Sequence, residues 1–239
     1  MANLKGLHRS RYVSRMFARI SKRYDLLNGV MSGGRHHAWR RTAARFAAVG
    51  PPGPAVDIAT GTGDFALELA RNPAVTGVVG LDFTREMLSI AIDKVKRKEP
   101  SKSVDMVVGD AHRLPFPSDR FICATVGFGV RNFSEVRRAL EEMVRVVRPE
   151  GHVAVLEIVR VPNSGVLNRA FRLYFRYVTP WLGTLLAGDR EAYTYLPESA
   201  QGFFSAEQLM GMMTEAGLSD VACRKLALGS VALLVGRKP

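Results

Sequence analysis

An apolar stretch that runs into a glycine-rich loop constrains the fold of this chain more than any other feature. The segment reads Val56-Asp57-Ile58-Ala59-Thr60-Gly61-Thr62-Gly63-Asp64, and Asp82 ends the next apolar stretch. A loop that must approach a ligand closely, with unusual backbone dihedrals, selects glycine. This order of strand, glycine loop and helix predicts a nucleoside cofactor at the end of a strand.

The acidic residues around the loop favour one class of cofactor. The pattern Gly61-x-Gly63-x-x-Ala66 also fits the dinucleotide fingerprint, whose pyrophosphate would lie at the N-terminus of the next helix. Asp57 and Asp64 would repel that pyrophosphate. S-adenosylmethionine has an ammonium, a sulfonium and no phosphate, so nearby carboxylates can orient the ammonium while Asp82 accepts hydrogen bonds from the ribose. An NAD-dependent oxidoreductase remains the alternative.

Apolar and amphipathic segments then alternate along the chain, which is typical of a parallel sheet with helices on both faces. The ligand site of such a sheet lies at the carboxyl ends of its strands. The pattern predicts a doubly wound, mostly parallel, seven-stranded α/β sheet with a Rossmann-like arrangement, closed by an antiparallel hairpin as in class I methyltransferases. The expected strands are 55–59, 77–82, 104–108, 121–126, 152–159, 219–226 and 229–236, and the expected helices are 64–71, 84–98, 134–148 and one from Ser205.

The N-terminal part of the chain is strongly basic. Residues 1–50 contain 11 of the 34 Lys and Arg residues and only one of the 22 acidic residues. We expect a helical leader over 1–50, with helices over 9–21 and 36–48 joined by a glycine-containing loop over 23–34. A methyltransferase domain over 51–239 follows, with a helical insertion at about 160–204. A basic leader fits an anionic membrane surface or nucleic acid, and a solvated face is the simpler alternative.

Other features narrow the location and the partners. Cys123 and Cys223 have no partner at metal-ligand spacing, so they predict buried thiols in a reducing compartment and no metal. No secretory signal is recognisable, and arginines and a proline interrupt the apolar stretch 166–187. We therefore expect a cytoplasmic protein, peripheral on the inner face of the membrane. The leader lacks a base-stacking motif, so no nucleic-acid partner is expected, although an RNA-modifying protein remains a third hypothesis.

Four further motifs identify a relationship that covers nearly the whole chain. They are Arg23-Tyr-Asp-Leu-Leu-Asn28 with Met31-Ser32 and Trp39-Arg40, Gly109-Asp-Ala111 with Leu114-Pro-Phe-Pro117, Gly127-Phe-Gly-Val-Arg-Asn132, and Tyr195-Leu-Pro-Glu-Ser199. With these motifs in this order, the chain resembles the ubiquinone/menaquinone biosynthesis C-methyltransferase family. The resemblance implies methylation of the ring of a prenylated quinol by S-adenosylmethionine, with demethylmenaquinol favoured over a ubiquinol precursor. A methyltransferase acting on another small molecule or on RNA is the alternative.

The resemblance also implies roles for the cofactor site. Thr62 and the loop glycines would contact the methionine part, Asp82 the ribose, and Asp110 with Ala111 the adenine. Phe83 follows the ribose acid and could lie on the adenine ring. The full set expected to bind the cofactor is Asp57, Gly61, Thr62, Gly63, Asp82, Phe83, Asp110, Ala111 and Gly127.

Methylation of a quinol ring needs a base or a group that stabilises a phenolate. Arg131 and Asn132, just beyond strand 121–126, are the expected catalytic residues; a surface ion pair with Glu135 is the alternative role for Arg131. The base is left open among a water held by Asp64 or Arg131, the histidines His36 and His37, and Glu157. The expected substrate pocket consists of Tyr24, Asn28, His36, Trp39, Arg131 and Tyr195.

Two departures from the family pattern and one amphipathic segment complete the predictions. Ile122 replaces the usual Asp, so we expect a polar group to be missing near the site, and Gly127 replaces a frequent Ser. The segment 166–183 mixes aromatic residues with arginines, which suits an interfacial helix over the pocket that reaches a lipid quinol. A core or homodimer contact is the alternative for that segment.

Overall fold

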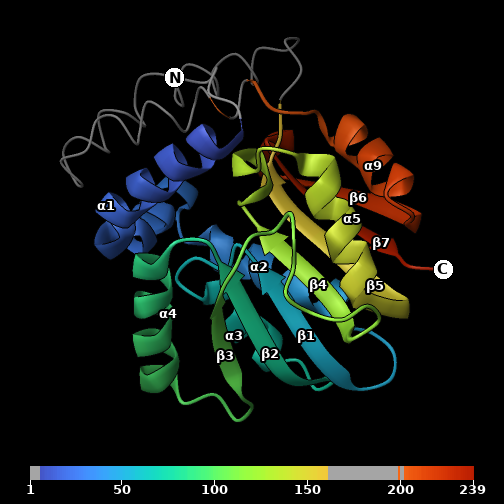
Figure 1. Ribbon diagram of the computed structural model, residues 1–239, viewed down its shortest axis with the longest axis horizontal. Coiled ribbons are helices and arrows are strands. Elements are labelled where there is room, and N and C mark those ends of the chain that lie inside the picture. The colour runs from blue at the N-terminus through green and yellow to red at the C-terminus, as the bar shows by residue number, and fades with distance from the viewer. Residues whose placement is uncertain (1–5, 161–198, 200–201) are drawn as a thin grey trace.

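The computed structural model describes residues 6–160, 199 and 202–239 (Figure 1). Seven strands form one sheet in the order β3-β2-β1-β4-β5-β7-β6. The strands are β1 (Gly53–Ile58), β2 (Val75–Asp82), β3 (Val104–Val108), β4 (Phe121–Gly127), β5 (Val147–Ile158), β6 (Ser219–Leu226) and β7 (Val231–Arg237). The helices are α1 (Gly6–Ser32), α2 (Arg35–Ala47), α3 (Asp64–Ala70), α4 (Arg85–Lys98), α5 (Val136–Val146) and α9 (Ala206–Glu215).

The strand order confirms the predicted doubly wound sheet. Strands β1 to β5 pair in parallel, and β7 pairs antiparallel with both β5 and β6. The chain leaves β1 toward β2 and β3, then returns to place β4 on the other side of β1. This reversal of direction opens a crevice at the carboxyl ends of β1 and β4, which is where doubly wound sheets bind their ligands.

Two apolar layers cover the sheet. Ala43 on α2 and Phe65 on α3 belong to the layer on one face, whereas Leu140 on α5 and Leu209 on α9 belong to the layer on the other. Figure 1 shows α5 and α9 in front of the sheet and α2 and α3 behind it. Side chains on both layers are almost fully buried, so the hydrophobic effect holds the strand ends in fixed positions.

The leader differs from its prediction. We expected the glycine-containing segment 23–34 to form a loop, but α1 continues through it to Ser32. A single glycine inside a helix costs about 1 kcal/mol relative to alanine, which the burial of Met16 and Ile20 on the same helix can offset. The chain turns only at Gly33 and Gly34, whose φ values of +57° and +75° favour glycine.

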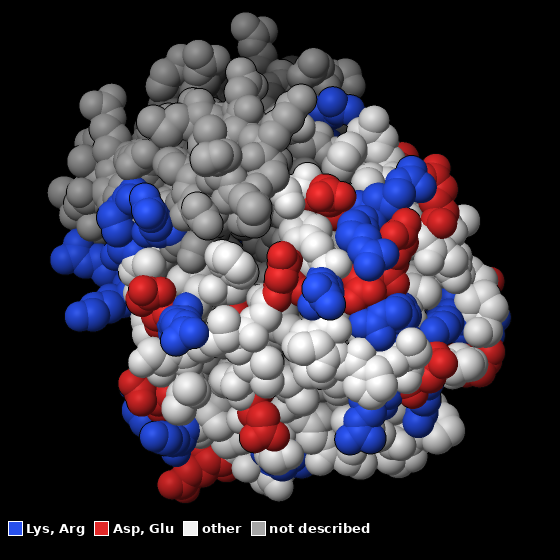
Figure 2. All heavy atoms as spheres, viewed as in Figure 1, with Lys and Arg blue, Asp and Glu red and all other residues white. Residues whose placement is uncertain are grey.

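The exposed side of α1 combines basic and apolar side chains. Arg15 and Lys22 are exposed, and Leu26 and Val30 are 56% and 41% exposed. Figure 2 shows basic side chains gathered at the edge of the molecule where α1 lies, whereas acidic and basic side chains alternate over much of the rest of this face. The leader is thus basic on its surface as well as in its sequence.

The expected effect of Ile122 on the site is wrong. Ile122 is fully buried near the start of β4, whereas Gly127 ends that strand at the crevice. A Cβ atom on Gly53 would lie only 2.5 Å from Cγ2 of Ile122, so this part of the core is tightly packed. Ile122 therefore contributes apolar packing at the opposite end of β4, and its replacement of Asp does not alter the crevice.

The predicted insertion at about 160–204 and the interfacial segment 166–183 lie almost entirely outside the described residues, and so does Tyr195. Beyond them, Ser205 caps α9 as expected. Its Oγ accepts a hydrogen bond from the backbone N–H of Gln208 at 3.2 Å, and the Gln208 side chain accepts one from the backbone of Ser205.

Candidate active site

The glycine loop connects β1 to α3 at the crevice. Gly61 and Gly63 have φ values of +56° and +82°, so both adopt the left-handed region that other residues rarely occupy. A Cβ atom on Gly63 would also lie 3.2 Å from Cβ of Ala91 on α4. The glycines are therefore required by the backbone of the turn and, at Gly63, by the close approach of a helix.

Asp82 fixes this loop from the neighbouring strand. Its carboxylate accepts hydrogen bonds from the backbone N–H of Gly61 at 2.9 Å and of Thr84 at 2.8 Å. Burial raises the pKa of Asp82, although these hydrogen bonds oppose the shift. The same residue lines a cavity beside the loop, so one carboxylate holds the loop and faces this space.

Asp57 has a different position from the one expected for a residue that contacts the cofactor. It is 1% exposed, and its carboxylate accepts hydrogen bonds from the hydroxyls of Thr60 at 2.6 Å and Thr125 at 2.7 Å. Burial raises the pKa of Asp57 to about 7. The hydrogen bonds of Asp57 thus connect β1 to the glycine loop and to β4. Asp57 does not line the cavity that Asp82 lines.

This pKa predicts a pH-dependent effect of replacing Asp57 with asparagine. The folded protein binds the proton of Asp57 more tightly than the unfolded chain does, so this residue's contribution to stability falls as the pH rises from about 4 toward 7. The Asp57→Asn variant has no charge to bury, so its stability relative to wild type should be greater at pH 8 than at pH 5. Urea unfolding of both proteins at the two pH values tests this; a constant difference would contradict it.

A cavity lies at the carboxyl ends of the strands and extends under α1. Phe17 of α1 and Met87 of α4 add apolar surface to this cavity, and neither residue was predicted from the sequence to lie at the site. Thr62 and Gly63 do not line this cavity. The predicted residues that do line it are Gly61, Asp82, Phe83, Asp110, Ala111 and Gly127 from the cofactor set, together with Tyr24 and Asn132.

Asp110 follows β3 and lines the same cavity. Its carboxylate accepts a hydrogen bond from the backbone N–H of His112 at 2.9 Å and lies 2.5 Å from Nδ1 of the same histidine. The side chain of Asp110 remains half exposed. Phe83 is 48% exposed beside the cavity, which leaves its ring available to a flat group.

A second cavity adjoins the first. Phe128 lines both, and it takes a φ of +61°, an unusual conformation for an aromatic residue. Four of the six residues predicted for the substrate pocket line the second cavity: Asn28, His36, Trp39 and Arg131. The structure therefore brings residues of the leader together with residues that follow β4 around one cavity.

Arg131 is buried and paired with Glu157, the last-but-one residue of β5. Its Nη1 lies 2.5 Å from Oε1 of Glu157 and donates to the carbonyl of Phe128 at 2.8 Å, while its backbone N–H donates to Oε2 at 3.1 Å. Both residues are 5% exposed or less. The suggested surface pair with Glu135 is therefore wrong, and Glu157, with both oxygens occupied, is not a suitable base.

His36 keeps a free acceptor. The hydroxyl of Ser32 lies 2.6 Å from the carbonyl of Asn28 and 2.8 Å from Nδ1 of His36. A carbonyl can only accept, so the hydroxyl proton points to Asn28, and Nδ1 of His36 must donate to Ser32. Burial lowers the pKa of His36 to about 4. The ring is therefore neutral at pH 7, and its Nε2 has a lone pair without a partner among the described residues.

An ion-pair network connects the leader to the glycine loop. Lys94 of α4 donates to Asp25 at 2.6 Å, to Asp64 at 2.7 Å and to the Thr62 hydroxyl at 3.1 Å. That hydroxyl in turn donates to the other oxygen of Asp25 at 2.6 Å. Thr62, predicted to contact the cofactor, therefore uses its side chain to hold α1 against the loop. Sequence spacing gave no signal for Lys94.

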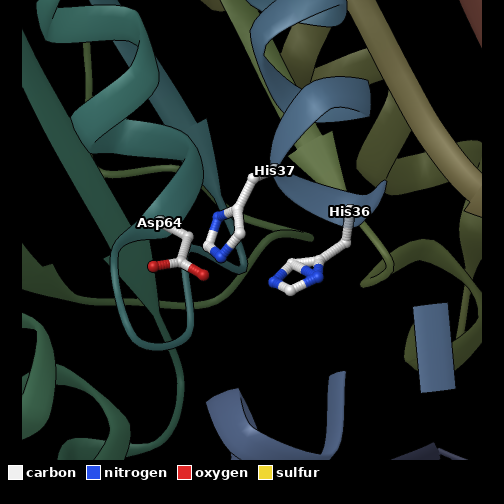
Figure 3. Close-up of side chains that lie close together, drawn as sticks. All are labelled: His36, His37 and Asp64. Atoms are coloured by element: carbon white, nitrogen blue, oxygen red, sulfur yellow. The ribbon is translucent and has the colours of Figure 1, made fainter. Parts of the chain in front are cut away.

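Three potential metal ligands also lie close together here. One ligand atom each of His36, His37 and Asp64 lies within 4.8 Å of the others, and Figure 3 shows the two rings at the start of α2 beside the carboxylate at the start of α3. Burial opposes ionisation of Asp64, but Lys94 and Arg40 outweigh it and lower its pKa. Because two cations already neutralise this carboxylate, the cluster is a poor site for a divalent ion.

Comparisons with known proteins agree with this geometry. The model of the ubiE/COQ5 methyltransferase family matches residues 5–238. The chain belongs to the ubiE/COQ5 methyltransferase family. This membership confirms the predicted enzyme class, an S-adenosylmethionine-dependent methyltransferase, and its cofactor. It gives no support to the oxidoreductase alternative.

Curated members of the ubiE/COQ5 family resemble the chain over nearly its full length. A demethylmenaquinone methyltransferase of Deinococcus radiodurans is 43% identical over 226 residues, which cover 95% of this chain and 92% of that protein. The ubiquinone/menaquinone biosynthesis C-methyltransferase UbiE of Pseudomonas aeruginosa is 37% identical over 238 residues, which cover 99% and 93%.

Solved structures share the fold at lower identity. The [4+2]-cyclase SpnF has a TM-score of 0.68 at 20% identity, with 96% of each chain covered. A Thermotoga maritima methyltransferase, described as a possible histamine N-methyltransferase, has a TM-score of 0.64 at 20% identity, covering 94% of this chain and 99% of that one. Since one of the two is a cyclase, the fold alone does not identify the acceptor.

Proposed function

We propose that this enzyme transfers a methyl group from S-adenosylmethionine to a ring carbon of a prenylated naphthoquinol of the demethylmenaquinol type. The observation that carries the proposal is the nearly full-length similarity to relatives named demethylmenaquinone methyltransferase. A demethylated ubiquinol precursor is the second candidate, because relatives named UbiE match almost as well.

In this proposal the cofactor occupies the first cavity. Asp110 and Ala111 hold the adenine, Asp82 accepts hydrogen bonds from the ribose hydroxyls, and the methionine part extends toward Gly127. Asp57, Thr62 and Gly63 act indirectly, because they keep the loop in its conformation. S-adenosylmethionine supplies an electrophilic methyl group when bound. The described residues that line this cavity offer suitable partners: the two acidic acceptors Asp82 and Asp110, glycine backbone, and an exposed aromatic ring.

The quinol ring occupies the second cavity, so that residues 1–50 form part of the substrate pocket. Phe128 separates the two cavities, and the ring carbon would approach the methyl group past its side chain. Arg131 is positioned by Glu157 to stabilise negative charge on a quinol oxygen, with Asn132 beside it. Trp39 and Phe128 provide apolar surface that excludes water from the reacting atoms.

Methyl transfer from labelled S-adenosylmethionine tests the proposal. Chemically reduced demethylmenaquinol and a reduced demethylated ubiquinone precursor are supplied in separate vesicle preparations containing anionic lipid. Labelled menaquinol, formed much faster than the benzoquinol product, is the expected result. Methyl transfer to the benzoquinol alone would reverse the choice of head group. If a folded protein that binds S-adenosylhomocysteine methylates neither compound, a quinol acceptor is contradicted.

We further propose that the enzyme meets this lipid substrate at an anionic membrane surface through α1. None of the helices in the described part of the chain is long and apolar enough to cross a bilayer. Leu26 and Val30 are exposed on α1, with Arg15 and Lys22 nearby, a combination that favours an interfacial helix.

Charge reversal on α1 is expected to weaken this association. An Arg15→Glu/Lys22→Glu variant should bind vesicles of anionic lipid at least about tenfold more weakly than wild type, since each basic residue near such a surface contributes about 1 kcal/mol. Co-sedimentation with anionic and with neutral vesicles measures the effect. The matched control is Lys96→Glu/Lys98→Glu at the end of α4. Equal loss in both variants would show that net charge, and not α1, controls binding.

A further inference from the structure

The buried guanidinium of Arg40 has a donor that the protein leaves without an acceptor. Arg40 lies on α2 and is 5% exposed, and its Nη1 has no hydrogen-bond partner among the described residues. Oδ2 of Asp64 lies 3.8 Å from this nitrogen, beyond hydrogen-bond distance. Because arginine remains charged in proteins, a buried N–H of this kind costs free energy unless something else accepts its proton.

Arg40 lies next to the cofactor cavity, against two residues of its wall, although it does not line the cavity itself. Its Cζ lies 5.4 Å from the centroid of the Phe128 ring, and a Cβ atom added to Gly127 would lie 3.9 Å from its Nε. Gly127 and Phe128 both line the cofactor cavity. The guanidinium therefore lies behind the part of the cavity wall that Gly127 and Phe128 form. In the proposed placement of the cofactor, the methionine part extends toward this wall.

Of the two cations beside Asp64, Arg40 lies farther from its carboxylate than Lys94 does. Lys94 lies 2.6 Å from Asp25 and 2.7 Å from Asp64, so these two carboxylates already have a close cation. Neutral His36 adds an acceptor but no negative charge. The only carboxylate paired with Arg40 among the described residues is Asp64, at 3.8 Å, and Lys94 lies closer to it, so an anionic group that enters this part of the cavity would find a guanidinium with a free donor.

We propose that Arg40 binds the α-carboxylate of the methionine part of the cofactor. This inference rests on the proposed placement of the cofactor in the first cavity. A guanidinium can form two parallel hydrogen bonds with a carboxylate, and such bonds to a charged group are the strong ones. Asp64, which lies 3.8 Å from Arg40, then offers an acidic partner to the ammonium of the same amino acid. Arg40 thus determines the specificity for an amino-acid nucleoside.

Two ligands distinguish binding of the carboxylate by Arg40 from a general effect of the substitution on the shape of the cavity. S-adenosylhomocysteine carries the amino-acid carboxylate, whereas 5′-methylthioadenosine has the same adenine, ribose and sulfur without it. Titration calorimetry should show that Arg40→Gln weakens binding of S-adenosylhomocysteine by about 10- to 100-fold and changes binding of 5′-methylthioadenosine by less than about twofold. Arg40→Lys, which keeps the charge, should lose less.

Arg41 is the matched control. It follows Arg40 on α2, but its side chain is 55% exposed and lies 3.5 Å from Glu68. Arg41→Gln should bind both ligands as wild type does. If Arg40→Gln weakens both ligands equally, or neither, the inference is overturned. The test contains no quinol, so a failure of the acceptor assay with an intact Arg40 effect would overturn the proposed substrate and leave this inference standing.

Discussion

Replacing Arg131 with methionine is expected to lower the free energy of unfolding by about 3–5 kcal/mol, because the fully buried Glu157 would lose the cation that pairs with it. A second change, Glu157→Gln, removes that buried charge and should recover much of the stability. Urea unfolding of the single and double variants measures both effects. The reason is geometric: the Arg131 side chain and its backbone N–H both bind this one carboxylate.

The double variant separates stability from catalysis. If Arg131 stabilises charge on the quinol oxygen, Arg131→Met/Glu157→Gln should transfer methyl about 100- to 1000-fold more slowly than wild type while still binding S-adenosylhomocysteine. The matched comparison is Arg138→Met on α5, an exposed arginine that lines neither of the two cavities. A double variant that regains stability and turns over at the wild-type rate would restrict Arg131 to a structural role.

Replacing Asp82 with alanine should weaken binding of S-adenosylhomocysteine by about 100-fold, or about 3 kcal/mol. The change removes the acceptor of the Gly61 N–H and, in the proposed placement, the acceptor of the ribose hydroxyls. Asp82→Asn keeps one oxygen acceptor and should lose less. Calorimetry measures both, with Asp105→Ala, an exposed carboxylate on β3, as the control. Unchanged affinity of a folded Asp82→Ala protein would reject this placement of the ribose.

The sheet was predictable because its signals are local. Each strand and helix shows its own periodicity, and the short connection before β7 permits only a hairpin, so the fold followed from segments of a few residues. The leader was not predictable in the same way. Segment 23–34 has weak helix-forming residues, and the packing of α1, which no local signal reveals, overrides that preference.

The candidate site was predictable only in part. Asp82 and the loop glycines follow from one motif, and the structure places them side by side. The partners of other residues lie far along the chain: Glu157 is 26 residues from Arg131, and Lys94 is 69 residues from Asp25. Such pairs depend on the crossovers of the sheet, so residue type and spacing could suggest a role for each residue but could not name its partner.

The contact between Asp25 and Thr62 affects how sequence variants of this enzyme should be interpreted. Asp25 lies on the leader helix and does not line the cofactor cavity, yet its carboxylate accepts a hydrogen bond from a side chain of the glycine loop. A charge change at this position would therefore resemble a cofactor-binding defect in any screen that scores activity. Genetic data alone would assign Asp25 to the wrong site.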